Sequence, residues 1–186
     1  MNQSLHRVVC WKDWNDNGFE HLTLKQDSSG YLVQSVITGE HGGNEFDLQY
    51  SLRLDSGWCT REVTAEITGG QSIHLFSDAK GKWTSPDGQE IESLAGCIDV
   101  DIAATPFTNT LPIRRLILQI NQTKKVKVTY VQLPTLKLQA VDQRYTRLGA
   151  QKFLYEGMQS GFSAELDVDR DGIVLDYPEV FKRQKT

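Results

Sequence analysis

Residues 46–54 read Phe-Asp-Leu-Gln-Tyr-Ser-Leu-Arg-Leu, a strict alternation of apolar and polar side chains. A period of two residues is that of a β-strand with one buried face and one solvated face. Phe46, Leu48, Tyr50, Leu52 and Leu54 would share the buried face. The stretch therefore predicts a half-buried strand. The segments on either side of it in the sequence indicate what kind of sheet contains this strand.

The same alternation recurs at residues 62–68, 124–130, 136–140 and 162–168. Turn-forming runs such as Ser28-Ser29-Gly30, Asp55-Ser56-Gly57 and Pro86-Asp87-Gly88 separate the strands, which is typical of an antiparallel meander. A mean strand of about 5–6 residues leaves room for roughly 12–15 strands. No long stretch repeats every 3.6 residues, and we expect helices only at 111–118 and 178–182.

Many antiparallel strands leave exposed edges, which a protein protects by closing or curling the sheet. We therefore expect an all-β, predominantly antiparallel fold: a single curved sheet or incomplete β-barrel with one or two short helices. At 186 residues the chain fits one domain spanning 1–186. A curved sheet leaves a concave face on which a ligand could bind.

Charge and composition exclude several classes of protein. The 20 basic and 24 acidic residues give a net charge of −4, which argues against a nucleic-acid partner that binds through phosphates. No apolar stretch reaches the roughly 18 residues of a transmembrane segment. The N-terminal residues lack the apolar core of a secretion signal, so we expect a cytoplasmic protein.

The metal and cofactor motifs are weak or absent. Residues 167–172, Asp-Val-Asp-Arg-Asp-Gly, match the start of a calcium-binding EF-hand loop, but Pro178 stands where the loop needs a bidentate glutamate. We favour a hairpin turn there over a metal site. Cys10, Cys59 and Cys97 are spaced neither for disulfides nor for zinc. Phosphate-loop and dinucleotide-binding motifs are also missing, so we expect no metal and no cofactor.

The segment 96–116 carries the strongest candidates for a site. Asp99 and Asp101 share one face of an expected strand, and Arg114 and Arg115 follow in the same segment. Three interpretations stay open. The four residues could form a structural ion-pair network, bind a polar ligand such as a sugar, or provide two carboxylates for acid–base catalysis.

A second candidate patch is Gly-Trp-Cys-Thr-Arg at 57–61. The Trp58 ring offers a flat apolar face, and the Arg61 guanidinium can hold phosphate or hydroxyl oxygens. A core tryptophan beside an ion-paired arginine is an equally good interpretation.

These segments also resemble a known family. The resemblance is to the putative glycolipid-binding proteins of bacteria, and it extends from about Val9 to Arg183. It is carried by Gly-Cys-Ile-Asp-Val-Asp-Ile at 96–102, Thr-Pro-Phe-Thr-Asn-Thr-Leu-Pro-Ile-Arg-Arg-Leu at 105–116, Trp-Cys-Thr-Arg at 58–61, Tyr-Val-Gln-Leu-Pro at 130–134, Gln-Arg-Tyr-Thr-Arg-Leu at 143–148 and the 169–178 stretch. The resemblance implies a β-rich domain with a curved sheet or incomplete barrel, and it implies no catalytic residues.

Together these observations favour non-catalytic binding of an amphiphile, a glycolipid or lipid-like molecule, in a concave β-sheet cavity. Trp58, Arg61, Asp99, Asp101, Arg114 and Arg115 are the candidates for its polar head. Two alternatives stay open: a hydrolase or isomerase that uses the Asp pair, and a structural or interaction module with a filled core. The ligand's identity and the oligomeric state do not follow from the sequence.

Overall fold

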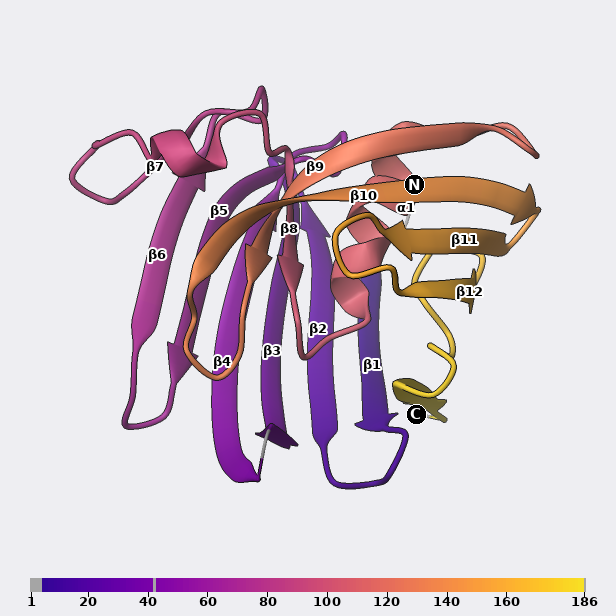
Figure 1. The fold of residues 1–186 in the computed structure, drawn as a ribbon, viewed down its shortest axis with the longest axis horizontal. Coiled ribbons are helices and arrows are strands. Elements are labelled where there is room, and N and C mark those ends of the chain that lie inside the picture. Colours follow the sequence, from indigo (N-terminus) through magenta and orange to yellow (C-terminus); the bar gives the residue numbers. More distant parts are fainter. Residues whose placement is uncertain (1–4, 42, 186) are drawn as a thin grey trace.

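The protein is built from two β-sheets, seen in a computed structural model that describes residues 5–41 and 43–185 (Figure 1). The larger sheet contains, in spatial order, β13 (Phe181–Gln184), β1 (His6–Asp13), β2 (Phe19–Asp27), β3 (Gly30–His41), β4 (Asn44–Leu54), β5 (Thr60–Ile67), β6 (Ser72–Ser77) and β7 (Trp83–Thr84). All its neighbours pair antiparallel.

The smaller sheet contains β12 (Ser163–Asp167), β11 (Lys152–Gly157), β10 (Leu138–Gly149), β9 (Thr123–Val131) and β8 (Asp99–Ile102). Its strands are antiparallel except for β8, which runs parallel to β9. One α-helix, α1 (Thr110–Leu116), and two short 3₁₀ turns at Glu92–Leu94 and Phe107–Asn109 lie in the segment that surrounds β8.

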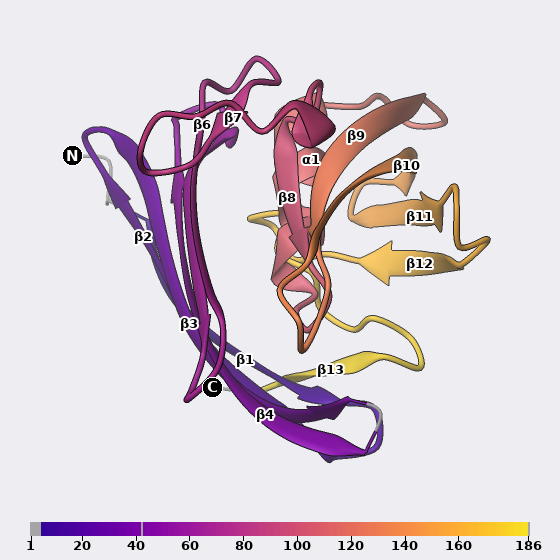
Figure 2. The same cartoon turned by 60° about the vertical axis from the view of Figure 1, so that its left-hand side comes forward.

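The larger sheet curls into a half-barrel, which confirms the predicted fold class. Figure 2 shows β8 and α1 between this curled sheet and the strands β9–β12. The second sheet is an addition to the expected architecture. The parallel β8 belongs to it because the chain passes from β8 through α1 before it returns as β9, and a crossover of this length allows parallel pairing.

The alternation at 46–54 correctly predicts the buried face of β4, whose five apolar side chains are all buried. Leu52 lies opposite Val33 of β3 and Val63 of β5, and all three are inaccessible to solvent. Such cross-strand contacts on one face are the main source of sheet stability. The polar side chains of β4 face outward.

One of the two expected helices is absent. Residues 178–182 form a turn followed by the start of β13, whereas α1 lies within two residues of the helix expected at 111–118. The turn is fixed from outside, because the carbonyl of Val180 accepts a hydrogen bond from the Trp14 amide and Phe181 pairs with Asp13. Glu179 has φ of 64°, in the left-handed region, which ends any helix there.

Bulky side chains fill most of the hollow of the curled sheet. Trp11, Trp83 and Phe107 are fully buried, and the indole nitrogen of Trp83 donates to the Cys97 carbonyl at 2.8 Å. A second, smaller apolar cluster joins α1 to the small sheet through residues such as Ile113. Two cavities among the described residues lie where the two sheets meet. No helix in the described ranges is long and apolar enough to span a bilayer.

Candidate functional site

Asp99 and Arg115 form a buried ion pair. Asp99 on β8 is inaccessible to solvent, and Arg115 at the end of α1 donates from Nε to Oδ1 at 3.0 Å and from Nη2 to Oδ2 at 2.6 Å. Burial raises the pKa of Asp99, and the guanidinium opposes the shift. Two parallel hydrogen bonds fix both side chains, so the pair ties α1 to β8.

Trp58 and Arg114 also contact each other. Trp58 is buried with its ring centroid 4.3 Å from that of Tyr31, and the exposed Arg114 lies over the indole at 4.9 Å. Arg61 is exposed and donates to the Asp78 carbonyl at 2.7 Å. The five predicted residues Trp58, Arg61, Asp99, Arg114 and Arg115 are not among the residues lining the two cavities described below.

Asp101 does line a cavity. Its Oδ2 accepts a hydrogen bond from Nε2 of Gln143 at 2.6 Å, and its Oδ1 accepts one from Oγ1 of Thr108 at 3.0 Å. The hydroxyl of Tyr145 donates to Oε1 of Gln143 at 3.2 Å, and Nδ2 of Asn109 donates to that hydroxyl at 2.9 Å. The chain of bonds holds the carboxylate in one orientation. Burial raises the pKa of Asp101, and the bonds from Gln143 and Thr108 oppose the rise.

An aromatic wall stands beside Asp101. Tyr155, Phe162, Tyr177 and Phe181 line the same cavity, and neighbouring ring centroids lie 6.0–6.3 Å apart. Burial, together with the nearby negative charge of Asp101, raises the pKa of Tyr155 and Tyr177. Both phenols therefore stay protonated at neutral pH and can donate hydrogen bonds.

These residues enclose the polar–aromatic cavity, which has a volume of about 530 Å³. Its floor comes from β8, β10 and the loop before α1, and its walls come from β11, the loop before β12 and the turn before β13. The volume lies within the range of ordinary small-molecule sites. A polar floor of few groups with apolar walls is the usual composition of such a site.

A second, apolar cavity of about 280 Å³ lies next to the first. Its apolar lining comes mainly from Trp11, Phe19, Ile37, Phe46, Leu133 and Phe181. The two cavities share four lining residues, namely Ala103, Tyr130, Val180 and Phe181. They therefore adjoin and form one continuous space, lined mostly by apolar side chains with polar groups in each part.

The apolar cavity contains one buried carboxyl group, that of Glu20. Sequence reasoning missed Glu20, although a signal was present. In Glu20-His21-Leu22-Thr23-Leu24 the glutamate alternates with the same period as the two leucines. Side chains two residues apart in a strand point to the same face, so Glu20 is expected on the apolar face. Gln143, Tyr155 and Tyr177 were also missed, because their convergence depends on how β10, β11 and the C-terminal turn pack.

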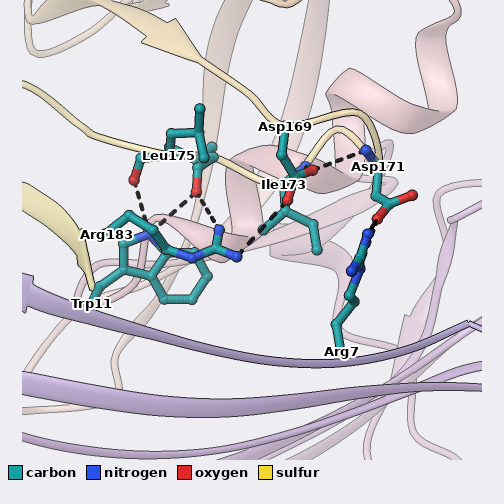
Figure 3. A network of polar contacts seen from close by, with 8 residues as sticks. Arg7, Trp11, Asp169, Asp171, Ile173, Leu175 and Arg183 are labelled. Carbon is teal, nitrogen blue, oxygen red and sulfur yellow. Dashed lines mark hydrogen bonds and ion pairs between the residues drawn. The ribbon is translucent and has the colours of Figure 1, made fainter. Parts of the chain in front are cut away.

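The Asp-rich turn at 167–172 serves to dock the C-terminal segment (Figure 3). Oδ1 of Asp169 accepts hydrogen bonds from the amides of Asp171 and Ile173, and Val168 pairs with Val174 across the turn, as the hairpin interpretation predicts. Arg7 of β1 forms an ion pair with Asp171. Among the described residues there is no cluster of three or more potential metal ligands.

The same loop is also bonded to β1 and β13. The indole nitrogen of Trp11 donates to the carbonyls of Val174 and Leu175 at 3.2 and 3.1 Å (Figure 3). Arg183 lies over the Trp11 ring at 5.0 Å and donates to the Val174 carbonyl. These contacts position the turn that carries Tyr177 and Phe181 into the cavities.

A family model described as "Putative glycolipid-binding" matches residues 8–183. The chain is also similar to the crystal structure of a DUF1089 family protein from Pseudomonas aeruginosa, with 38% sequence identity, a TM-score of 0.84, and coverage of 90% of this chain and 92% of that chain. No curated protein matches the sequence. The chain belongs to the family described as "Putative glycolipid-binding".

Proposed function

We propose that the protein binds a single amphiphile across the two adjoining cavities without transforming it. The polar–aromatic cavity would hold a sugar head, and the apolar cavity would hold the start of a hydrocarbon chain. The observation that carries this proposal is the position of Asp101: an oriented carboxylate beside four aromatic rings, in a cavity that continues into an apolar one.

The chemistry of the first cavity suits a sugar. A carboxylate accepts several hydrogen bonds, so the oxygens of Asp101 can take ligand hydroxyls in addition to Gln143 and Thr108. The C–H face of a pyranose ring is apolar and packs on aromatic side chains such as Tyr155 and Phe162. The protonated phenols can donate to ring and hydroxyl oxygens.

The second cavity suits an alkyl or acyl chain. A chain segment that buries about 250 Å² of apolar surface gains about 6 kcal/mol at ~25 cal/mol per Å². Ordering of ligand and side chains removes part of this gain, so a micromolar Kd is expected for an amphiphile that fills both cavities.

Two observations favour binding over the alternatives. Asp99 is fully buried against Arg115, so it does not share the cavity with Asp101. The other aspartate of the lining, Asp142, forms an ion pair with Lys125 at 2.9 Å, so it is held as a charged surface group rather than as the partner of Asp101 in an acid–base pair. The two adjoining cavities are also hard to reconcile with a module whose core is completely filled.

The test uses dodecyl β-D-maltoside below its micellar concentration and isothermal titration calorimetry. Phe162 is 43% exposed at the cavity, and Phe76 of β6 is 37% exposed and does not line either cavity. We expect Phe162→Ala to weaken binding about fivefold, because stacking of this kind contributes about 1 kcal/mol. Phe76→Ala should leave the Kd unchanged.

Asp101→Asn tests the polar end. Removing the charge of the acceptor should weaken maltoside binding about tenfold or more. The control is Asp47→Asn, an exposed position on β4. The absence of any binding by the unmodified protein up to the micellar concentration of the maltoside, or equal losses in the cavity and control variants, would refute the proposal.

A further inference from the structure

The apolar cavity holds a carboxyl group that the fold leaves half-paired. Glu20 lies on the inner face of β2 and is 3% exposed. Its Oε1 accepts hydrogen bonds from Oγ of Ser35 and from the hydroxyl of Tyr50, both at 2.7 Å. Its Oε2 has no hydrogen-bond partner among the described residues.

A buried acceptor without a partner costs roughly 1–3 kcal/mol, so native proteins rarely keep one without a reason. Glu20 forms no ion pair with any residue that the structure describes. The other charged side chains that line this cavity, Asp13 and Glu40, are acidic. The Thr105 hydroxyl lies close enough to Glu20 to oppose the rise of its pKa, but it makes no hydrogen bond to Oε2. A ligand in the cavity is therefore the natural source of a donor for that oxygen.

The position of Glu20 indicates which part of a ligand reaches it. Tyr50, which donates to Glu20, also lies 3.3 Å from Oγ1 of Thr105, and Thr105 lines the polar–aromatic cavity. Glu20 is thus close to the boundary between the two cavities. In an amphiphile this boundary corresponds to the first carbons of the chain, next to the head.

The kind of donor follows from the other demands of an apolar cavity. A hydroxyl satisfies Oε2 and needs nothing further, whereas an amide brings a carbonyl that requires a donor of its own. An ammonium group would have to be desolvated among aromatic and aliphatic side chains, which is costly.

We propose that the ligand's hydrocarbon chain carries a hydroxyl close to its head, and that this hydroxyl donates to Oε2 of Glu20. The assignment rests on the proposed function, because it needs an amphiphile that spans both cavities. It adds a specificity rule to that function: hydroxylated chains are selected over plain ones of equal length.

The experiment compares two probes that differ by one oxygen, dodecyl β-D-glucoside and 2-hydroxydodecyl β-D-glucoside, by calorimetry at pH 8. A hydrogen bond to a charged group contributes about 1.5–3 kcal/mol, so the unmodified protein should prefer the hydroxylated probe by at least tenfold. Glu20→Gln should reduce this preference severalfold and still bind the plain glucoside. Its amide oxygen can keep the bonds from Ser35 and Tyr50, and the NH₂ that then faces the cavity can only donate a neutral hydrogen bond to the ligand's hydroxyl, which is weaker than a bond to a charged carboxylate.

Glu45→Gln is the matched control, because Glu45 is exposed on β4 and does not line either of the two cavities. It should keep the full preference. Equal affinity of the unmodified protein for both probes, or a preference that is undiminished in Glu20→Gln, would overturn the assignment while leaving the proposed function intact. Failure of both probes to bind would overturn the proposed function and, with it, this assignment.

Discussion

Glu20 also makes a prediction about stability that needs no ligand. Burial raises its pKa from 4.5 to about 7, while the nearby hydroxyls of Thr105, Ser35 and Tyr50 oppose the rise. The unfolded chain releases this proton near pH 4.5, but the folded protein keeps it until about pH 7. The unfolded state is therefore favoured progressively as the pH rises between these values, and the protein loses stability.

The magnitude follows from the difference between the two pKa values. A shift from 4.5 to about 7, at about 1.36 kcal/mol per pKa unit, corresponds to a loss of about 3 kcal/mol that is complete above pH 7. Glu20→Gln removes the proton equilibrium and keeps a similar shape. The variant should match the unmodified protein near pH 4.5 and be about 3 kcal/mol more stable at pH 8.

Urea unfolding followed by tryptophan fluorescence at pH 5, 6, 7 and 8 measures this difference. The stability difference between variant and unmodified protein should grow by about 2–3 kcal/mol from pH 5 to pH 8. Subtracting the unfolding free energies of the two proteins cancels the contributions of the other titrating groups. For Glu66→Gln, at an exposed position, this free-energy difference should not grow with pH. A difference that stays constant across the series would refute the argument that Glu20 is a buried carboxyl without a counter-charge.

Two further predictions concern the scaffold. Arg115→Met should destabilise the protein by about 3–5 kcal/mol in the same assay, because it leaves the Asp99 carboxylate buried without a partner. Arg61→Met, at an exposed position, should cost less than about 1 kcal/mol. Equal losses of stability in the two variants would contradict the buried ion pair. Gly30→Ala should cost more than about 2 kcal/mol, because Gly30 has φ of +139° and a Cβ there would lie 2.1 Å from a carbonyl oxygen of β4. Gly69→Ala, at φ of +69° with nothing within 4 Å, should cost about 1 kcal/mol, and a similar cost at both glycines would refute the steric argument.

The position of the cavities changes how the half-barrel is understood. A curled sheet suggests a hollow interior, but large side chains such as Trp83 and Phe107 are fully buried. The two adjoining cavities lie where the small sheet and the turn at 177–181 meet the large sheet. The contacts of Trp11, Arg7 and Arg183 with the 169–175 loop hold that turn in place, so they bear indirectly on the site.

The sequence predicted part of the candidate site and missed the rest. Asp101 is a candidate because it lies with Asp99 on the polar face of an alternating strand, and it lines the polar–aromatic cavity. Asp99, two residues away on the same face, was grouped with it, but the structure pairs it with Arg115. The pattern alone could not separate the two, because it says which face a side chain occupies and nothing about the element packed against that face.

The prediction of a helix at 178–182 is wrong for a related reason. Local propensity there is weak, and antiparallel pairing of β13 with β1 provides the hydrogen bonds instead. The strand β1 is more than 160 residues away in the sequence, so no local window contains its influence.

The sequence by itself determined the strands and their buried faces, because alternation with a period of two is a local property of the chain and burial follows directly from it. It also carried the family, through segments spread over most of the chain. Only the tertiary structure decided that Glu20 and Asp101 lie in adjoining cavities and that aromatic rings from β11 and the C-terminal turn enclose them. A cavity is the space that inward-facing side chains from distant strands leave unfilled, and this depends on packing in three dimensions rather than on the order of residues.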